Sequence, residues 1–129
     1  MRISFLVAIS HCCRVSVFLF FQIVSYLIAR PPKEPEEWSQ HRTTVMLNVP
    51  PGTDFWRKTR TDEVVDNAPF YYLEVEGDFE VRVKVKANYD NPDDQAGIMV
   101  REDEENWIKL GIQMVGDVPH MCATITHDL

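Results

Sequence analysis

Basic residues are scarce in this 129-residue chain, which holds 13 Lys and Arg against 20 Asp and Glu. Arg2, Arg14 and Arg30 are the only charged residues among residues 1–30. Residues 31–129 therefore carry ten basic and 20 acidic groups. Binding to a nucleic-acid backbone needs a field of Lys and Arg side chains. We therefore expect no nucleic-acid partner for this chain.

Cysteine is also rare, with Cys12 and Cys13 adjacent near the N-terminus and Cys122 near the other end. Cys122 is alone after residue 30, so that part of the chain cannot form an internal disulfide. No Cys-x-x-Cys pair occurs, and the histidines show no spacing typical of a metal site. We expect neither a metal nor a cofactor, and we interpret Cys122 as a small apolar strand residue.

No uninterrupted apolar run reaches the roughly 20 residues that a membrane-spanning helix needs. Residues 1–30 are mostly apolar, but Arg14 interrupts them. Three interpretations of this N-terminal segment stay open: a membrane anchor, a cleaved signal segment, or a segment foreign to the domain. A membrane is a partner only in the first case. Residues 31–42 begin with a Pro- and Glu-rich stretch and are expected to form a polar linker.

Helical periodicity is missing too, and residues 43–129 instead alternate apolar and polar side chains with a period of two. In Phe79–Lys86 the four apolar residues should face the core and the four charged residues the solvent. The turn residues 76–78 before it predict a hairpin with residues 70–75. We expect about seven strands: 43–49, 55–60, 70–75, 79–86, 95–101, 107–115 and 120–126. Such a pattern predicts an antiparallel all-β sandwich.

Three motifs go beyond this general pattern: Thr-Asp-Phe-Trp-Arg at 53–57, Asp-Gln-Ala-Gly-Ile-Met-Val-Arg at 94–101, and Trp-Ile-Lys-x-Gly at 107–111. With them the chain resembles the concanavalin A-like domain-of-unknown-function family that includes the fungal regulation-of-enolase protein. The resemblance implies a jelly-roll sandwich and a cytoplasmic domain, but no particular reaction. Asp93 and Gln113 depart from the family, which usually has Tyr and Glu there. The chain also ends before a later family motif, so we expect a jelly roll that is incomplete at the C-terminus.

The strand at 107–115 also suggests a ligand-binding surface. Its apolar residues Ile108, Leu110, Ile112 and Met114 should form the core side, which places Trp107, Lys109 and Gln113 on the opposite face. An aromatic ring flanked by planar polar groups is typical of carbohydrate-binding surfaces. An alternative is that the same residues are core tryptophans and internal ion pairs. The candidate ligand-binding residues are Gln95, Arg101, Trp107, Lys109, Asp54 and Trp56.

No catalytic arrangement emerges from the acidic residues. Residues 102–105 are four consecutive acids, which is typical of a solvated turn, and the Asp-rich segment 90–94 is better explained as a turn than as a calcium site. Glycoside hydrolysis needs two carboxyl groups about 5–9.5 Å apart. For a glucanase-like enzyme, the acids that we would nominate are Asp54, Asp94 and Glu74.

The sequence therefore predicts a leader at 1–30, a linker at 31–42 and a partial β-sandwich at 43–129. The expected function is that of a non-catalytic binding or regulatory domain for a carbohydrate or protein ligand. The family resemblance links it to intracellular carbohydrate metabolism. The alternative is a glucanase-like glycoside hydrolase. The protein is expected to be cytoplasmic, or membrane-anchored if residues 1–30 act as an anchor.

Overall fold

Every regular element in the described part of the chain is a β-strand. The computed structural model describes residues 2–6, 13–19, 37–42, 44–74 and 77–128. The strands are β1 (Arg2–Leu6), β2 (Cys13–Leu19), β3 (Trp38–His41), β4 (Thr44–Val49), β5 (Phe55–Arg57), β6 (Val64–Asp66), β7 (Phe70–Glu74), β8 (Val83–Ala87), β9 (Gln95–Arg101), β10 (Trp107–Val115) and β11 (Val118–Thr126). All pairings between them are antiparallel, which confirms the predicted all-β class.

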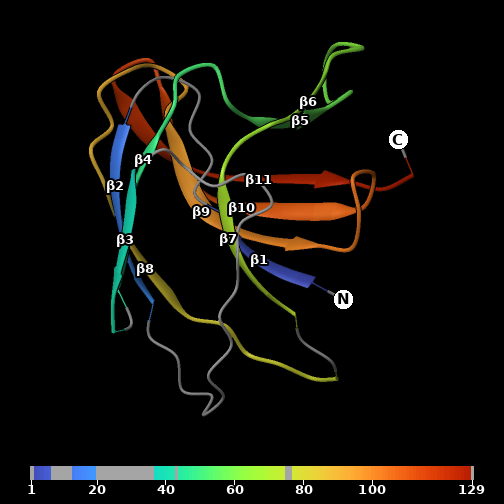
Figure 1. Cartoon of the computed structure of the whole chain (residues 1–129). Coiled ribbons are helices and arrows are strands. Elements are labelled where there is room, and N and C mark those ends of the chain that lie inside the picture. The colour runs from blue at the N-terminus through green and yellow to red at the C-terminus, as the bar shows by residue number, and fades with distance from the viewer. Residues whose placement is uncertain (1, 7–12, 20–36, 43, 75–76, 129) are drawn as a thin grey trace.

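The strands form two larger sheets and one small arm (Figure 1). The first sheet has the order β11-β10-β9-β1-β7, and the second has the order β3-β4-β2-β8. Strands β5 and β6 pair with each other and project beyond the first sheet (Figure 1). We call residues 54–66, which contain this pair, the β5–β6 arm.

Alternation along β4 and β8 explains the core side of the second sheet. Val45, Leu47 and Val49 are at most 5% exposed, whereas Met46 between them is 47% exposed. In β8 the valines are half-buried and the lysines are exposed. The period-two pattern predicted for this segment is therefore confirmed, although the strand begins at Val83 and not at Phe79.

The predicted hairpin of residues 70–86 is wrong. Strand β7 pairs with β1 in the first sheet, and β8 pairs with β2 in the second. The segment between them contains Gly77 at φ 74°, a left-handed conformation that favours glycine. Gly77 and Asp78 of the predicted turn thus lie on a connection between two sheets instead of joining neighbouring strands, and residue 76 lies outside the described residues.

The face assigned to the core in β10 is also corrected. Ile108 is 39% exposed and Leu110 is 48% exposed, whereas Trp107 is 4% exposed and Lys109 is 7% exposed. The reason is that Phe55 of the β5–β6 arm packs with Trp107 and Met99 in a buried cluster on the side expected to face a ligand. Apolar composition alone did not identify the covered face.

Two segments assigned outside the domain contribute strands. Strand β1 lies between β7 and β9, and β2 lies between β4 and β8. Strand β3, from the expected linker, pairs with β4 and is exposed. The proposed roles of residues 1–30 remain predictions. Among the residues that the structure describes, we find no helix with the length and apolar character needed to span a membrane.

Candidate ligand-binding face

The register of β9, β10 and β11 places four of the predicted site residues in rows on one face of the first sheet. Residues that pair across antiparallel strands point to the same face. The rows, written in the order β9, β10, β11, are Arg101–Trp107–Thr126, Met99–Lys109–Thr124, Gly97–Gly111–Cys122 and Gln95–Gln113–His120. We call this set of twelve residues the polar face. The structure therefore brings Gln95, Arg101, Trp107 and Lys109 onto one face.

The β5–β6 arm is fixed to the polar face through Asp54. The Lys109 Nζ atom lies 3.2 Å from Asp54 Oδ1 and donates to the Phe55 carbonyl at 2.9 Å. The Gln95 side-chain amide donates to the same Asp54 oxygen at 2.9 Å. Three of the predicted ligand-binding residues are therefore hydrogen-bonded to one another in this structure.

Burial and a neighbouring charge shift the pKa of Lys109 in opposite directions. Desolvation lowers the pKa of the Lys109 ammonium, because the charged form loses its hydration. The neighbouring Asp54 carboxylate favours the charged form and limits this decrease in pKa. The ammonium also lies 5.8 Å from the centre of the Trp107 ring, within the range of a cation–π contact. These partners hold Lys109 in one position.

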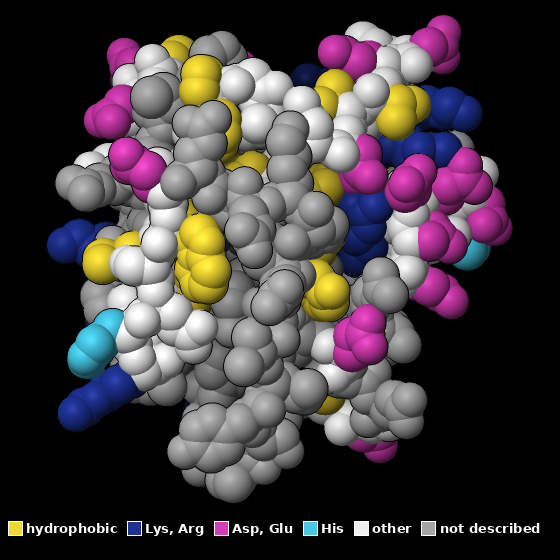
Figure 2. All heavy atoms as spheres, in the orientation of Figure 1, with side chains coloured by type: hydrophobic (Ala, Val, Ile, Leu, Met, Phe, Trp, Pro, Cys, Tyr) yellow, Lys and Arg dark blue, Asp and Glu magenta, His cyan; other side chains and the backbone are white. Residues whose placement is uncertain are grey.

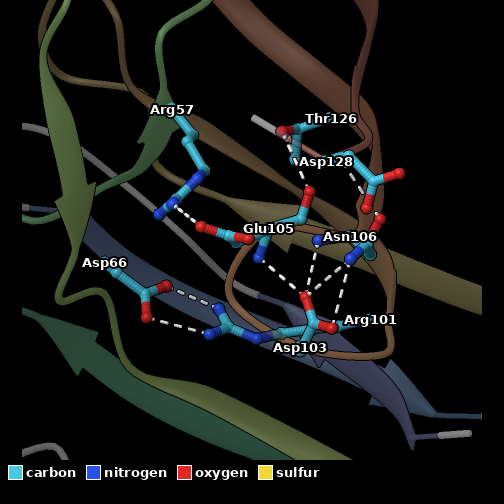
Figure 3. A network of polar contacts seen from close by, with 8 residues as sticks. All are labelled: Arg57, Asp66, Arg101, Asp103, Glu105, Asn106, Thr126 and Asp128. Atoms are coloured by element: carbon cyan, nitrogen blue, oxygen red, sulfur yellow. Dashed lines mark hydrogen bonds and ion pairs between the residues drawn. The ribbon is translucent and has the colours of Figure 1, made fainter.

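Arg101 makes a second connection to the arm. Its two terminal nitrogens donate to the two carboxylate oxygens of Asp66 at 2.5 and 2.8 Å, a bidentate pair (Figure 3). The guanidinium carbon also lies 5.3 Å from the Phe55 ring centre and 5.8 Å from that of Phe70. Those two rings meet edge-to-face at 5.5 Å. Arg101 therefore combines an ion pair with packing on two aromatic rings.

A third ion pair joins the arm to the acidic turn at residues 102–106. Arg57 pairs with Glu105 (Figure 3). Within the turn, Asp103 Oδ1 accepts from the backbone N–H groups of Glu105 and Asn106, both at 2.8 Å. These hydrogen bonds lower the pKa of the Asp103 carboxyl, with that from Glu105 contributing most. The prediction that this acidic run is a turn is confirmed.

Three ion pairs attach the arm, and we call them the arm clamp: Lys109–Asp54, Arg101–Asp66 and Arg57–Glu105. Figure 2 shows Lys and Arg side chains gathered in the recess beside the arm, with Asp and Glu side chains around them. Of the two tryptophans predicted to bind ligand, Trp107 is buried and Trp56 in β5 is half-buried. Much of the predicted ligand surface thus contributes to holding the arm.

Beyond the clamp, the polar face has a shallow hollow of about 10 Å³. That volume is roughly the space for one water molecule. Its floor is the facing pair Gly97 and Gly111, and its margin includes Gln95, Gln113 and Thr124. No tryptophan or tyrosine is among its lining residues. The hollow is therefore small and of mixed polar and apolar lining, with no aromatic platform.

The acids considered for hydrolysis have structural partners or lie exposed. Asp94 is fully buried, and its Oδ2 atom accepts from the N–H groups of Asp90 and Asn91, both at 2.9 Å. This arrangement confirms the turn predicted for residues 90–94. Asp54 is engaged by Lys109 and Gln95, and Glu74 is exposed. Within the described ranges, no three His, Cys, Asp or Glu side chains are grouped to hold a metal ion.

Comparison with known proteins places the chain in a family. The family described as "Protein of unknown function (DUF1349)" matches residues 32–129. The chain belongs to this family.

One relative in the family is "Regulation of enolase protein 1" of Saccharomyces cerevisiae, which is 37% identical over 94 residues. These residues make up 73% of this chain and 48% of the yeast protein, so the chain spans about half the length of this curated relative. No solved structure matches the chain. The family and its relative agree with the resemblance carried by the three motifs.

Several residues of the arm clamp and of the polar face were not identified from the sequence. Asp66 and Glu105 complete the arm clamp but lie 35 and 48 positions from their arginine partners. Thr124 and His120 lie on the polar face because the Gly116-Asp117 turn fixes the register of β11 against β10. That turn is recognisable in the sequence. Pairing residues outward from it would therefore have placed Thr124 and His120 on the polar face. No local sequence pattern indicates that Asp66 and Glu105 pair with these arginines.

Replacing Arg101 with lysine is expected to lower the free energy of unfolding by about 1–3 kcal/mol. Lysine keeps the charge but cannot make the bidentate pair with Asp66 or stack its planar group on Phe55 and Phe70. Urea denaturation followed by fluorescence would measure the loss. Arg82→Lys serves as a control, because Arg82 has an exposed side chain and should change stability by less than about 0.5 kcal/mol. Equal stability of both variants would show that the clamp contributes little.

Proposed function

We propose that this family member is a non-catalytic regulatory domain that binds a protein ligand with the open end of its polar face. The supporting observation is the division of that face. One end is occupied by the arm clamp, and the other is an open, shallow surface formed by Gln95, Gln113, His120 and Thr124 around the glycine pair and continued by the exposed Val115 and Val118. A shallow, open surface of this kind suits a macromolecular partner better than an enclosed small molecule.

A protein ligand is favoured over a carbohydrate because of the tryptophans and the hollow. A sugar site benefits from an aromatic ring presented to solvent, but Trp107 is buried beneath the arm. The hollow beside Lys109 has space for about one water molecule. Glutamine and threonine side chains can instead exchange hydrogen bonds with a protein surface without the desolvation cost of a charge.

The yeast relative suggests which protein to test first. Its name describes regulation of enolase, and it matches this chain over three quarters of the chain's length but half of its own. We therefore propose enolase as the first candidate ligand and a regulatory role in carbohydrate metabolism, without catalysis by this domain. The arrangement of Asp54 and Asp94 gives no specific support to a glycoside hydrolase.

The test measures binding of purified enolase to the immobilised full chain by biolayer interferometry. A double variant, Gln113→Arg with Thr124→Arg, should weaken binding at least tenfold, because two long cations would cover the open end of the polar face. Lys84→Glu is the matched control, since Lys84 is exposed on β8 and should leave binding unchanged.

Three results would count against the proposal in different ways. Undiminished binding by the double variant would mean that the polar face is not the contact surface. Absence of enolase binding by the parent chain would remove enolase as the ligand. The third result would come from calorimetric titration with a panel of oligosaccharides. If the parent chain bound one of them and the double variant did not, a carbohydrate ligand would be favoured over a protein.

A further inference from the structure

The opposite face of β10 and β11 consists entirely of apolar side chains. We define the apolar face as Ile108, Leu110, Ile112 and Met114 of β10 with Pro119, Met121, Ala123 and Ile125 of β11. These residues pair across the two strands in a regular antiparallel register, so their side chains share one side of the sheet. The set contains no charged or hydrogen-bonding side chain.

Exposure of this surface increases toward the edge strand. In β9, Ile98 and Val100 are partly buried. In β10, the exposed fractions are 39% for Ile108 and 48% for Leu110. In β11, they reach 78% for Met121 and 66% for Ile125. Monomeric proteins rarely expose continuous apolar patches of more than a few hundred Å². The exposed fractions of Ile108, Leu110, Met121 and Ile125 alone correspond to roughly 450 Å², more than half of the ~800 Å² that each partner contributes to a stable interface.

We infer that the apolar face is the contact surface of a homodimer, in which two copies pack face to face about a two-fold axis. A two-fold axis requires a surface that is complementary to itself. The apolar face meets this condition because aliphatic side chains of one copy can interdigitate with those of the other, and no like charges are brought together. Packed sheets of this kind lie about 10 Å apart, as in a β-sandwich.

The distribution of charge supports a second copy as the occupant. The chain has a formal net charge of −7, so copies repel one another over most of their surfaces. The apolar face is a region where two acidic chains can approach without placing carboxylates opposite each other. It also lies on the other side of the sheet from the polar face, so the inference does not rest on the proposed function.

Sedimentation equilibrium of the full chain tests the inference. The 15.0 kDa chain should form a dimer that dissociates on dilution. Leu110→Lys with Ile125→Lys should weaken the dimer at least a hundredfold, because each copy would present two ammonium groups to its twin. Met46→Lys is the control, since Met46 is similarly exposed at 47% but lies on β4.

A measurement on the unsubstituted chain avoids any effect of the lysines on folding. Peroxide oxidises exposed methionine side chains, and the dimer should protect Met121. The oxidation rate of Met121 relative to Met46 should fall at least fivefold between a dilute and a concentrated sample. A chain that stays monomeric, a dimer insensitive to the lysine pair, larger irregular assemblies, or concentration-independent Met121 oxidation would each overturn the inference.

Discussion

Gly111→Ala is expected to lower the free energy of unfolding by about 3–5 kcal/mol, a large part of the stability of a domain of this size. A Cβ atom at residue 111 would lie 2.3 Å from the Ala96 carbonyl oxygen and 2.8 Å from the Gly97 Cα atom. Both contacts are with backbone of the paired strand β9, so no side-chain rotation can relieve them. The two strands would have to separate, which would break their ladder of hydrogen bonds.

Chemical denaturation of Gly111→Ala and of its counterpart Gly97→Ala would measure these losses. At residue 97 a Cβ atom would lie 2.0 Å from the Leu110 carbonyl oxygen, so a similar cost is expected. Gly116→Asn is the matched control, because Gly116 has φ 62° with no atom near its would-be Cβ, and asparagine tolerates this conformation. Wild-type stability for both alanine variants would mean that β9 and β10 are not so closely apposed.

Lys109→Met has the second largest expected effect, a loss of about 2–4 kcal/mol. Methionine can occupy the apolar space beside Trp107, but it leaves the Asp54 carboxylate without its cation and the Phe55 carbonyl without its donor. Removing one member of a buried ion pair typically costs about 3–5 kcal/mol. The Asp54 side chain is 22% exposed, so water would recover part of this cost.

The double variant Lys109→Met with Asp54→Asn distinguishes an ion pair from simple packing. Asparagine removes the unpaired negative charge while retaining a side-chain oxygen that can accept from the Phe55 and Gln95 N–H groups. The double variant should therefore be more stable than Lys109→Met alone when both are unfolded in urea. Additive losses would indicate that the two side chains do not interact.

Local patterns predicted most strands after residue 43, but they missed β1, β2, β3 and β6 and gave wrong partners for β7 and β8. The bounds of β9 and β10 follow from alternation, since Gln95–Arg101 and Trp107–Val115 were expected and observed. The hairpin of residues 70–86 failed because both flanking segments pair with N-terminal strands, a choice that depends on contacts distant in the sequence. Period two shows which residues share a face, but not which element covers that face.

The candidate site illustrates the same limit. Alternation placed Trp107 and Lys109 together, and the hairpin register joins Gln113 and Thr124 to them. The arm that covers Trp107 could not be inferred, because its attachment depends on Asp54 and Asp66 reaching cations many residues away. Residues that looked like ligand contacts thus became internal ion pairs, which had been the alternative interpretation.

The tight turn at Gly116 and Asp117 also bears on the order in which the sheet assembles. Strands β10 and β11 need only this two-residue connection to meet, whereas Arg2 of β1 pairs with Arg101 of β9 across most of the chain. Hairpins of this kind close in about 1–10 μs, and contacts between distant segments follow more slowly. The β10–β11 hairpin would then act as an early template. The polar face, which needs β9 and the arm as well, would be among the last surfaces to mature.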